Sequence, residues 1–156
     1  MSAFRRGVRL AVDVGRARVG VARCDPDGML AVPVETVARD DRSVARLAEL
    51  AGEHAPIEIM VGLPLNMRGE DTPSTQDARA FAAELGAALP GTPIRLVDER
   101  LSTVSAHTAL RQAGRSQKKS RSIVDQVAAV VFLQHAIDTE KRLGTAPGEV
   151  LAPGEE

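Results

Sequence analysis

The start of the chain restricts the fold most, because three strand-like segments follow one another there with no room for a helix between them. Apolar residues alternate with others from Val8 to Asp13, which is the two-residue period of a strand. Further strands are predicted at 19–24 and at about 29–37, separated by the turn sequence Asp25-Pro26-Asp27-Gly28. The chain therefore opens as an antiparallel meander.

After the meander, helical and strand-like segments alternate. Apolar spacing, helix caps and the breakers Pro and Gly mark their limits. The segments are predicted strands at 57–61 and 94–97 and predicted helices at 41–55, 72–89, 102–114 and 120–143. The order β-β-β-α-β-α-β-α-α predicts an α/β fold in which helices flank a mixed five-stranded sheet.

The length of 156 residues fits one compact domain. We assign residues 1–143 to it and expect 144–156, rich in Gly, Pro and Glu, to form a disordered tail. No apolar run is long enough to cross a bilayer, and the first residues do not resemble a secretion signal. The single Cys24 excludes a disulfide within the chain. We therefore expect a cytoplasmic protein with no membrane partner.

Three acids fall where such a fold exposes functional groups. Asp13 closes the first strand, Glu99 follows the last predicted strand, and Asp125 lies in the first turns of the last helix. Each has an ordinary structural interpretation as a turn cap or a surface acid. Ligands gather at the strand ends of α/β sheets, however, so the three acids are candidate catalytic residues if they converge.

A convergence of three carboxylates favours a divalent cation. Two carboxylates about 4 Å apart repel by roughly 4 kcal/mol at an effective dielectric near 20, and a cation removes that conflict. Oxygen ligands favour Mg²⁺ or Mn²⁺, and the sequence has no Cys or His cluster that would favour Zn²⁺. Such metal sites hydrolyse phosphodiester bonds.

Net charge gives a second constraint. With 20 Lys and Arg against 21 Asp and Glu, the net charge of -1 argues against a protein that coats nucleic acid indiscriminately. Between residues 111 and 121 there are nevertheless five basic residues and no acid: Arg111, Arg115, Lys118, Lys119 and Arg121. A local charge of +5 is typical of a solvated loop or of a phosphate-binding segment, and its place just before Asp125 favours phosphate.

Four ordered motifs together resemble the YqgF/RuvX family of ribonuclease-H-like proteins, known both as pre-16S rRNA nucleases and as Holliday junction resolvases. The resemblance covers nearly all of the chain before the tail. The motifs are the stretch from Leu10 to Ala22, the sequence Val61-Gly62-Leu63-Pro64 with Asn66 and Gly69, the sequence Asp98-Glu99-Arg100-Leu101-Ser102-Thr103, and Lys118-Lys119 followed by Asp125 and Ala128-Ala129.

The resemblance implies a ribonuclease-H-like sheet, a divalent-metal nuclease site at Asp13, Glu99 and Asp125, and a role in maturing the 5′ end of small-subunit ribosomal RNA. It makes residues of its motifs and of the basic segment candidates for substrate binding: Asn66, Arg100, Thr103, Arg115, Lys118, Lys119 and Arg121. Arg100 and Thr103 have equally good explanations as a salt bridge and a helix cap. Lys118-Lys119 is shorter than the basic run typical of the family, which leaves its register open.

Other functions remain open at this stage. The family's names allow a resolvase that cuts branched DNA, which would need a two-fold dimer, as well as a monomer acting on RNA. A non-catalytic RNA-binding factor in ribosome assembly would keep the same basic segment. The sequence Asp13-Val14-Gly15 also resembles the phosphate loop of sugar kinases and actin-like ATPases, but 156 residues supply only one of the two domains that such a nucleotide cleft needs.

Overall fold

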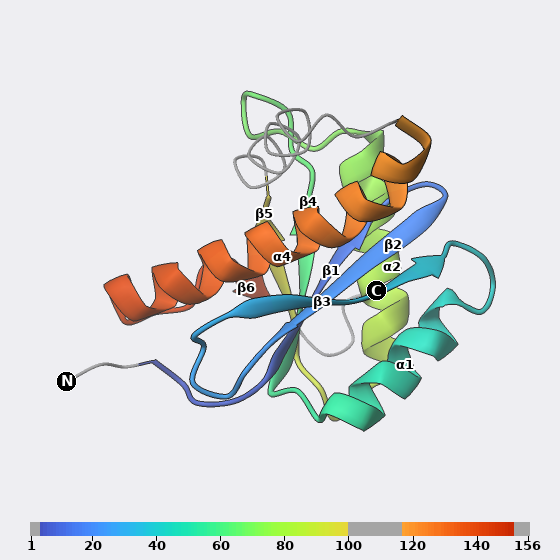
Figure 1. The fold of residues 1–156 in the computed structure, drawn as a ribbon. Coiled ribbons are helices and arrows are strands. Elements are labelled where there is room, and N and C mark those ends of the chain that lie inside the picture. The colour runs from blue at the N-terminus through green and yellow to red at the C-terminus, as the bar shows by residue number, and fades with distance from the viewer. Residues whose placement is uncertain (1–3, 100–116, 152–156) are drawn as a thin grey trace.

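The computed structural model describes residues 4–99 and 117–151, with only the helix backbone given for 117–125. Its elements as far as the fifth strand, and the long last helix, follow the predicted order, and a sixth strand comes after that helix (Figure 1). They are β1 (Arg9–Val14), β2 (Arg18–Cys24), β3 (Ala31–Ala38), α1 (Ser43–His54), β4 (Glu58–Leu63), α2 (Pro73–Ala88), β5 (Ile94–Asp98), α4 (Gln117–Leu143) and β6 (Glu149–Val150). The predicted helix at 102–114 lies outside the described residues.

The strands form one mixed sheet in the order β3-β2-β1-β4-β5-β6. Strands β1, β4 and β5 are parallel neighbours, whereas β2, β3 and β6 join them antiparallel. The carboxyl-terminal ends of β1, β4 and β5 therefore lie at one edge of the sheet, which we call the carboxyl edge. The first turns of α4 begin at this same edge (Figure 1).

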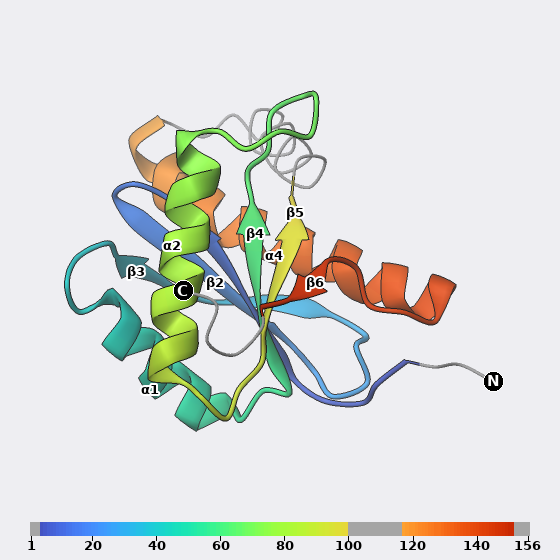
Figure 2. The same cartoon turned by 180° about the vertical axis from the view of Figure 1, so that it is seen from behind.

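Helices cover both faces of the sheet (Figure 2). Alternate residues of each strand point to opposite faces, so Leu10 and Val12 pack with α1 and α2 while Ala11 packs with α4. On the α4 face the sheet offers small residues, among them Ala11 and Ala22, to Ala129 and Phe132 of the helix. This lets α4 approach the sheet closely. No helix in the described ranges is long and apolar enough to span a membrane.

The sheet has six strands, so the prediction of five was wrong. The sixth strand lies in the segment 144–151, which we expected to be part of a disordered tail, so that expectation was wrong for these residues. Strand β6 pairs with β5 through Arg95 and Leu96, and Leu151 donates its N–H to the Ile94 carbonyl at 2.7 Å. Gly148 makes this approach possible, because a Cβ there would lie 2.0 Å from the Leu96 carbonyl oxygen. The remaining tail, 152–156, lies outside the described residues.

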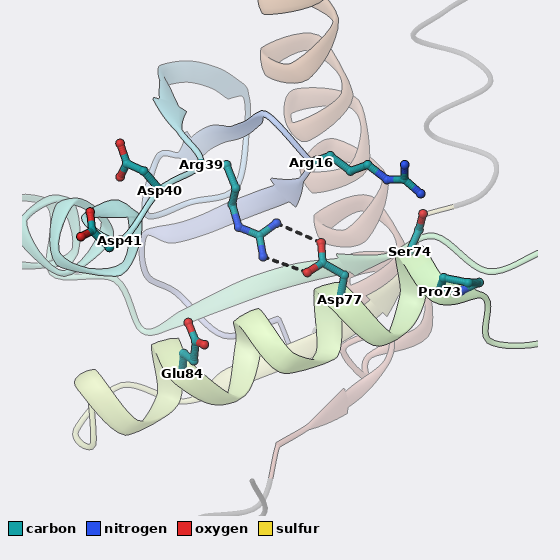
Figure 3. Close-up of a pocket in the computed structure, with 8 residues that line it drawn as sticks. All are labelled: Arg16, Arg39, Asp40, Asp41, Pro73, Ser74, Asp77 and Glu84. Atoms are coloured by element: carbon teal, nitrogen blue, oxygen red, sulfur yellow. Dashed lines mark hydrogen bonds and ion pairs between the residues drawn. The ribbon is translucent and has the colours of Figure 1, made fainter.

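A pocket of about 620 Å³ lies beside the turn that follows β1 (Figure 3). Arg39 forms a two-bond ion pair with Asp77 of α2, with both distances 2.9 Å, and donates to the Gly15 carbonyl at 2.9 Å. Its guanidinium also lies 4.9 Å from the centre of the Phe81 ring. Arg39 therefore fixes the turn next to Asp13 against α2.

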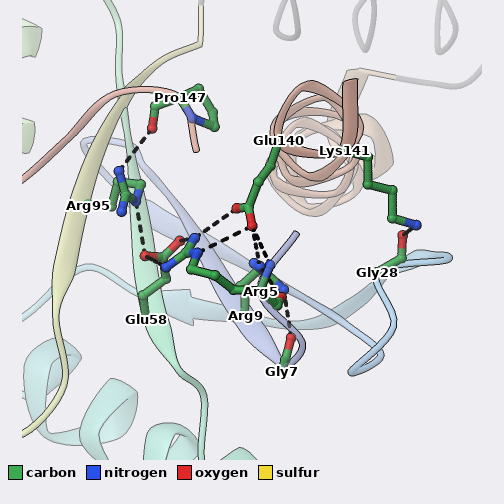
Figure 4. A network of polar contacts seen from close by, with 9 residues as sticks. All are labelled: Arg5, Gly7, Arg9, Gly28, Glu58, Arg95, Glu140, Lys141 and Pro147. Atoms are coloured by element: carbon green, nitrogen blue, oxygen red, sulfur yellow. Dashed lines mark hydrogen bonds and ion pairs between the residues drawn. The ribbon is translucent and has the colours of Figure 1, made fainter. Parts of the chain in front are cut away.

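At the opposite edge of the sheet, a buried ion network joins the last turns of α4 to β1 and β4 (Figure 4). Arg5 bridges Glu58 at 3.0 Å and Glu140 at 2.8 Å, and Arg9 bonds Glu140 at 3.0 Å. Arg95 provides a second partner for Glu58 at 3.0 Å. Both carboxylates have only 1% of their side chains exposed, so each depends on these cations for its charge.

Replacing Glu140 by Gln is expected to lower the free energy of unfolding by about 3 kcal/mol, because it leaves Arg9 buried beside a neutral partner. The measurement is urea denaturation of the variant and the parent. Asp27→Asn is the matched control, because the Arg6–Asp27 pair leaves 74% and 62% of its side chains exposed and should contribute little. Equal losses in the two variants would contradict a structural role for the network.

Candidate functional site

Two of the predicted site residues meet at the carboxyl edge. Asp13 is the penultimate residue of β1, and Glu99 directly follows β5. Strand parity places both on the α4 face, since Asp13 lies two residues after Ala11 and Glu99 two after Val97, which both pack against α4. The Glu99 carboxyl group is hydrogen-bonded to Asp13. The sheet order therefore brings together two acids that are 86 positions apart, counted as 99 minus 13.

Glycines make room for this acid pair. Strand β4 lies between β1 and β5, and at the level of the acids it presents Gly62. A Cβ on Gly62 would lie 2.2 Å from Glu99 Oε2 and 2.6 Å from its Cδ, so any side chain there would displace the carboxyl group. On the other side of Asp13, its cross-strand partner in β2 is Gly20. Asp13 thus has no bulky neighbour in the sheet at this level.

Burial and repulsion determine the protonation of Glu99. The residue is 4% exposed, and its Oε2 has no hydrogen-bond partner among the residues that the structure describes. Desolvation raises the pKa of Glu99 well above its usual value, and the negative charges of Asp13 and Asp98 raise it further. Two carboxyl groups that share a hydrogen bond need a proton between them or a cation beside them. Without a cation, Glu99 is the group that keeps the proton.

The pair fits a hard divalent cation. Both residues offer only oxygen, and Glu99 Oε2 is a buried acceptor that a cation would satisfy. Among the side chains that the structure describes, no group of three His, Cys, Asp or Glu residues could hold a metal. For Asp125, the third acid proposed from the sequence, the structure describes only the backbone. A metal site here therefore rests on Asp13, Glu99 and a residue still to be placed.

The backbone of α4 brings position 125 to the carboxyl edge. Ala129, one helical turn later, is fully buried and packs in the cluster that contains Ala11, Met60 and Val97. Gln126 donates its Nε2 to Thr36 Oγ1 at 2.7 Å, which fixes this turn of the helix over the sheet. Position 125 thus belongs to the part of α4 nearest the acid pair along the helix. Its participation stays a prediction.

The predicted substrate-binding residues are placed less completely. Asn66 lies in the loop between β4 and α2, where its Oδ1 accepts the N–H groups of Arg68 and Glu70, each at 2.9 Å. The structure thus shows Asn66 holding the loop, and a contact with substrate stays a prediction. Three candidates lie outside the described residues: Arg100, Thr103 and Arg115. Three others lie on the first turns of α4, where the structure describes only the backbone: Lys118, Lys119 and Arg121.

Sequence reasoning did not identify Gly62 as part of the site. Its motif suggested only a backbone role for Val61-Gly62-Leu63-Pro64. The signal was present, however, because an apolar strand that carries a glycine near its end marks a close approach by another group. Recognising that group as Glu99 requires the order of the strands.

Comparisons with known proteins show which sequences this chain resembles. Residues 7–139 match the family model RuvX, described as Holliday junction resolvase. A protein of Streptomyces avermitilis with the provisional name pre-16S rRNA nuclease is 52% identical over 148 residues, which are 94% of this chain and 95% of that protein. A protein of Clavibacter michiganensis with the same name is 53% identical over 151 residues, 95% of this chain and 93% of its own.

A solved structure shares the fold. Thermus thermophilus RuvC, solved in complex with a Holliday junction substrate, aligns with a TM-score of 0.56 and 19% sequence identity. The alignment covers 92% of this chain and 99% of that one. The likeness supports the predicted ribonuclease-H-like α/β architecture, a mixed sheet flanked by helices.

Proposed function

Because the chain belongs to the RuvX family, we propose that it is a nuclease that hydrolyses phosphodiester bonds and matures the 5′ end of pre-16S ribosomal RNA. The observation that supports this most is the contact at the carboxyl edge between the half-buried Asp13 and the buried Glu99, whose Oε2 has no partner among the described residues. A fold that needed only stability would not keep two acids in contact here, because burying one of them costs free energy. The proposed substrate also places the protein in the cytoplasm.

The proposal includes Mg²⁺ or Mn²⁺, held by Asp13, Glu99 and Asp125. Such an ion supplies positive charge for the phosphate in the transition state and a means of activating water. Asp13, which is half-buried, lies at the side of the pair open to solvent, whereas Glu99 lies at the buried side. On binding a cation, Glu99 would release to solvent the proton that it holds in the metal-free protein. Metal affinity should therefore rise with pH.

The basic segment before Asp125 is proposed to bind the phosphates of the nucleic acid. Lys118 and Lys119 are on the first turns of α4, which begins at the carboxyl edge. Cations at this place would counter the repulsion between the acid pair and a polyanionic strand. Arg100, Thr103, Arg115 and Arg121 are proposed to contribute to the same surface.

Replacing both Lys118 and Lys119 by Ala is expected to weaken RNA binding for all sequences alike. The slope of log K against log salt should become less steep by about 1.4 to 1.8, as expected when two phosphate contacts are lost. Filter binding at several salt concentrations measures this, with Lys141→Ala as control because Lys141 lies on the last turn of α4. An unchanged slope would indicate that the segment is an ordinary solvated surface that does not bind phosphates.

The substrate class is tested by offering two nucleic acids in parallel. Purified protein is incubated with a pre-16S rRNA fragment and with a four-way DNA junction, in Mg²⁺, Mn²⁺ or EDTA, beside Asp13→Asn. Metal-dependent cutting of the RNA by the parent alone supports the proposal. Cutting of the junction instead would favour a resolvase, which the family's description also allows and which requires a dimer. RNA binding without any cutting would indicate an assembly factor.

A further inference from the structure

The loop between β4 and α2, residues 64–72, leaves the carboxyl edge directly beside the acid pair. Glu99 donates its N–H to the carbonyl of Leu63 at 3.3 Å, so the last residue of β4, directly before the loop, is joined to the proposed metal ligand. Met67, four residues further on, can lie no more than about 14 Å along the chain from Leu63. Whatever occupies the acid pair is therefore within reach of this loop.

The loop is held in shape without the side chains of its tip. Asn66 accepts two backbone N–H groups through Oδ1, and its own N–H donates to the Glu70 carbonyl at 3.0 Å. At the base, Thr75 Oγ1 donates to the Pro64 carbonyl at 2.8 Å, and Thr72 caps α2. The tip residues Met67 and Arg68 therefore lie on a preformed turn, so their backbone loses little conformational entropy on binding.

The tip combines an apolar and a cationic side chain. Met67 is 93% exposed, the highest exposure among the large hydrophobic residues that the structure describes, and Arg68 is exposed beside it. Of the acids in the same loop, Asp71 is ion-paired with Arg79 at 2.7 Å, and the Glu70 carboxylate, which keeps its charge, is turned toward the base of the loop, where its Oε1 accepts from Asn66 Nδ2 at 3.2 Å. The tip therefore presents an apolar side chain and a cationic side chain together. A nucleic acid strand, which has apolar base faces and anionic phosphates, could contact both.

The chain has few other groups for contacting bases. Its three aromatic residues are Phe, and Phe81 and Phe132 are 2% and 1% exposed. Phe4 lies at the opposite edge, where Arg9 and Lys141 pack on its ring. Flexible, polarisable Met side chains adapt to irregular apolar surfaces, and apolar side chains can insert between bases. Met67 is a strongly exposed apolar side chain on the loop that leaves the carboxyl edge beside the acid pair.

We propose that Met67 packs against the bases of an unpaired RNA strand next to the phosphate that is cut, with Arg68 on the strand's backbone. This deepens the proposed nuclease function, on which it rests, by defining the substrate as a strand whose bases can leave the stack. A continuous duplex keeps its bases stacked and offers Met67 no apolar face. The loop thereby selects unpaired or easily unstacked RNA.

The test measures binding of a single-stranded RNA fragment that contains 2-aminopurine, a base whose fluorescence rises when it unstacks, in EDTA so that no cutting occurs. Met67→Ser should bind about 10-fold more weakly than the parent, as expected when a base contact is lost, and should reduce the fluorescence change. Met67→Phe should bind at least as well as the parent. Met29→Ser is the matched control, because Met29 is 71% exposed beside Lys141 at the opposite edge, and it should bind like the parent.

Equal affinities of Met67→Ser and the parent for the RNA would overturn the proposal. Equal losses of affinity in Met67→Ser and Met67→Phe would also overturn it, because they would indicate that Met67 has a protein-contact or structural role. The result is separable from that of the nuclease proposal. If the parent cuts no RNA but Met67→Ser still loses affinity and Met67→Phe keeps it, the base contact stands and the nuclease proposal fails. If the parent cuts RNA and Met67→Ser binds and cuts equally well, only the base contact fails.

Discussion

Replacing Glu99 by Gln is expected to reduce cleavage by about 1,000-fold or more and, in the same variant, to make the metal-free protein more stable at neutral pH. The loss follows because an uncharged amide cannot hold the cation whose charge stabilises the transition state, and several kcal/mol correspond to about three powers of ten in rate. The gain follows because Gln removes a buried acid that repels Asp13 and Asp98.

The stability effect has a definite pH dependence. Glu99 has a pKa raised above its ordinary 4.5 in the folded chain, so the folded state holds its proton more tightly than the unfolded state does. Its favourable contribution is complete below about pH 4.5 and is lost as the pH rises through the higher folded pKa. The advantage of Glu99→Gln over the parent should therefore grow across this window.

Thermal unfolding in EDTA between pH 4 and pH 9 measures this, with Glu53→Gln as control because Glu53 is exposed on α1. Added Mg²⁺ should stabilise the parent and leave Glu99→Gln unchanged. A variant that is less stable than the parent at every pH would show that the Glu99 carboxyl group supports the fold, which would contradict its assignment as a functional acid held at a cost.

Replacing Gly62 by Ala is expected to reduce cleavage by about 100-fold without touching any charged group, because displacement of a catalytic group by about 1 Å has this effect. The added Cβ would lie 2.2 Å from Glu99 Oε2, so the carboxyl group must move away. The crowding should also lower the free energy of unfolding by about 1 to 3 kcal/mol. Single-turnover cleavage and urea denaturation measure the two effects.

Gly52→Ala is the control for this variant, because a Cβ there meets no atom within 4 Å in α1 and should slightly stabilise the helix. The double variant Gly62→Ala, Glu99→Asp separates the two effects. The shorter acid withdraws from the new methyl group, so stability should return while cleavage stays low. Full activity in Gly62→Ala would show that the Glu99 carboxyl group does not need its present position.

Much of the fold was predictable because strong local patterns determine it. The meander was predicted from its two-residue alternation and the Asp25-Pro26-Asp27-Gly28 turn, and α2 from the Thr72-Pro73 cap, which the structure confirms as a capping box. Strand β6 was missed because two residues carry no periodicity and their pairing depends on β5, more than 50 residues earlier. Gly148 suggested a loose tail, yet it enables the close pairing.

The candidate site was only partly predictable. Asp13 and Glu99 could be selected because each stands at a strand end, a local property of the sequence. Their contact depends on β4 alone separating β1 from β5, which is a property of the whole sheet. The same long-range order gives Gly62 its importance. Asn66, by contrast, was considered only as a substrate contact, although Asn commonly holds turns by accepting nearby backbone N–H groups.

The central claim is that Asp13 and Glu99 bind a divalent cation at the carboxyl edge, and the binding of Mn²⁺ tests it most directly. Electron paramagnetic resonance of free Mn²⁺, titrated with the parent, Asp13→Asn and Glu99→Gln at pH 8, reports binding without any need for substrate. The parent should remove Mn²⁺ from solution, and both variants should do so at least 10-fold more weakly. Equal Mn²⁺ binding by all three proteins, or none by the parent, would contradict the account.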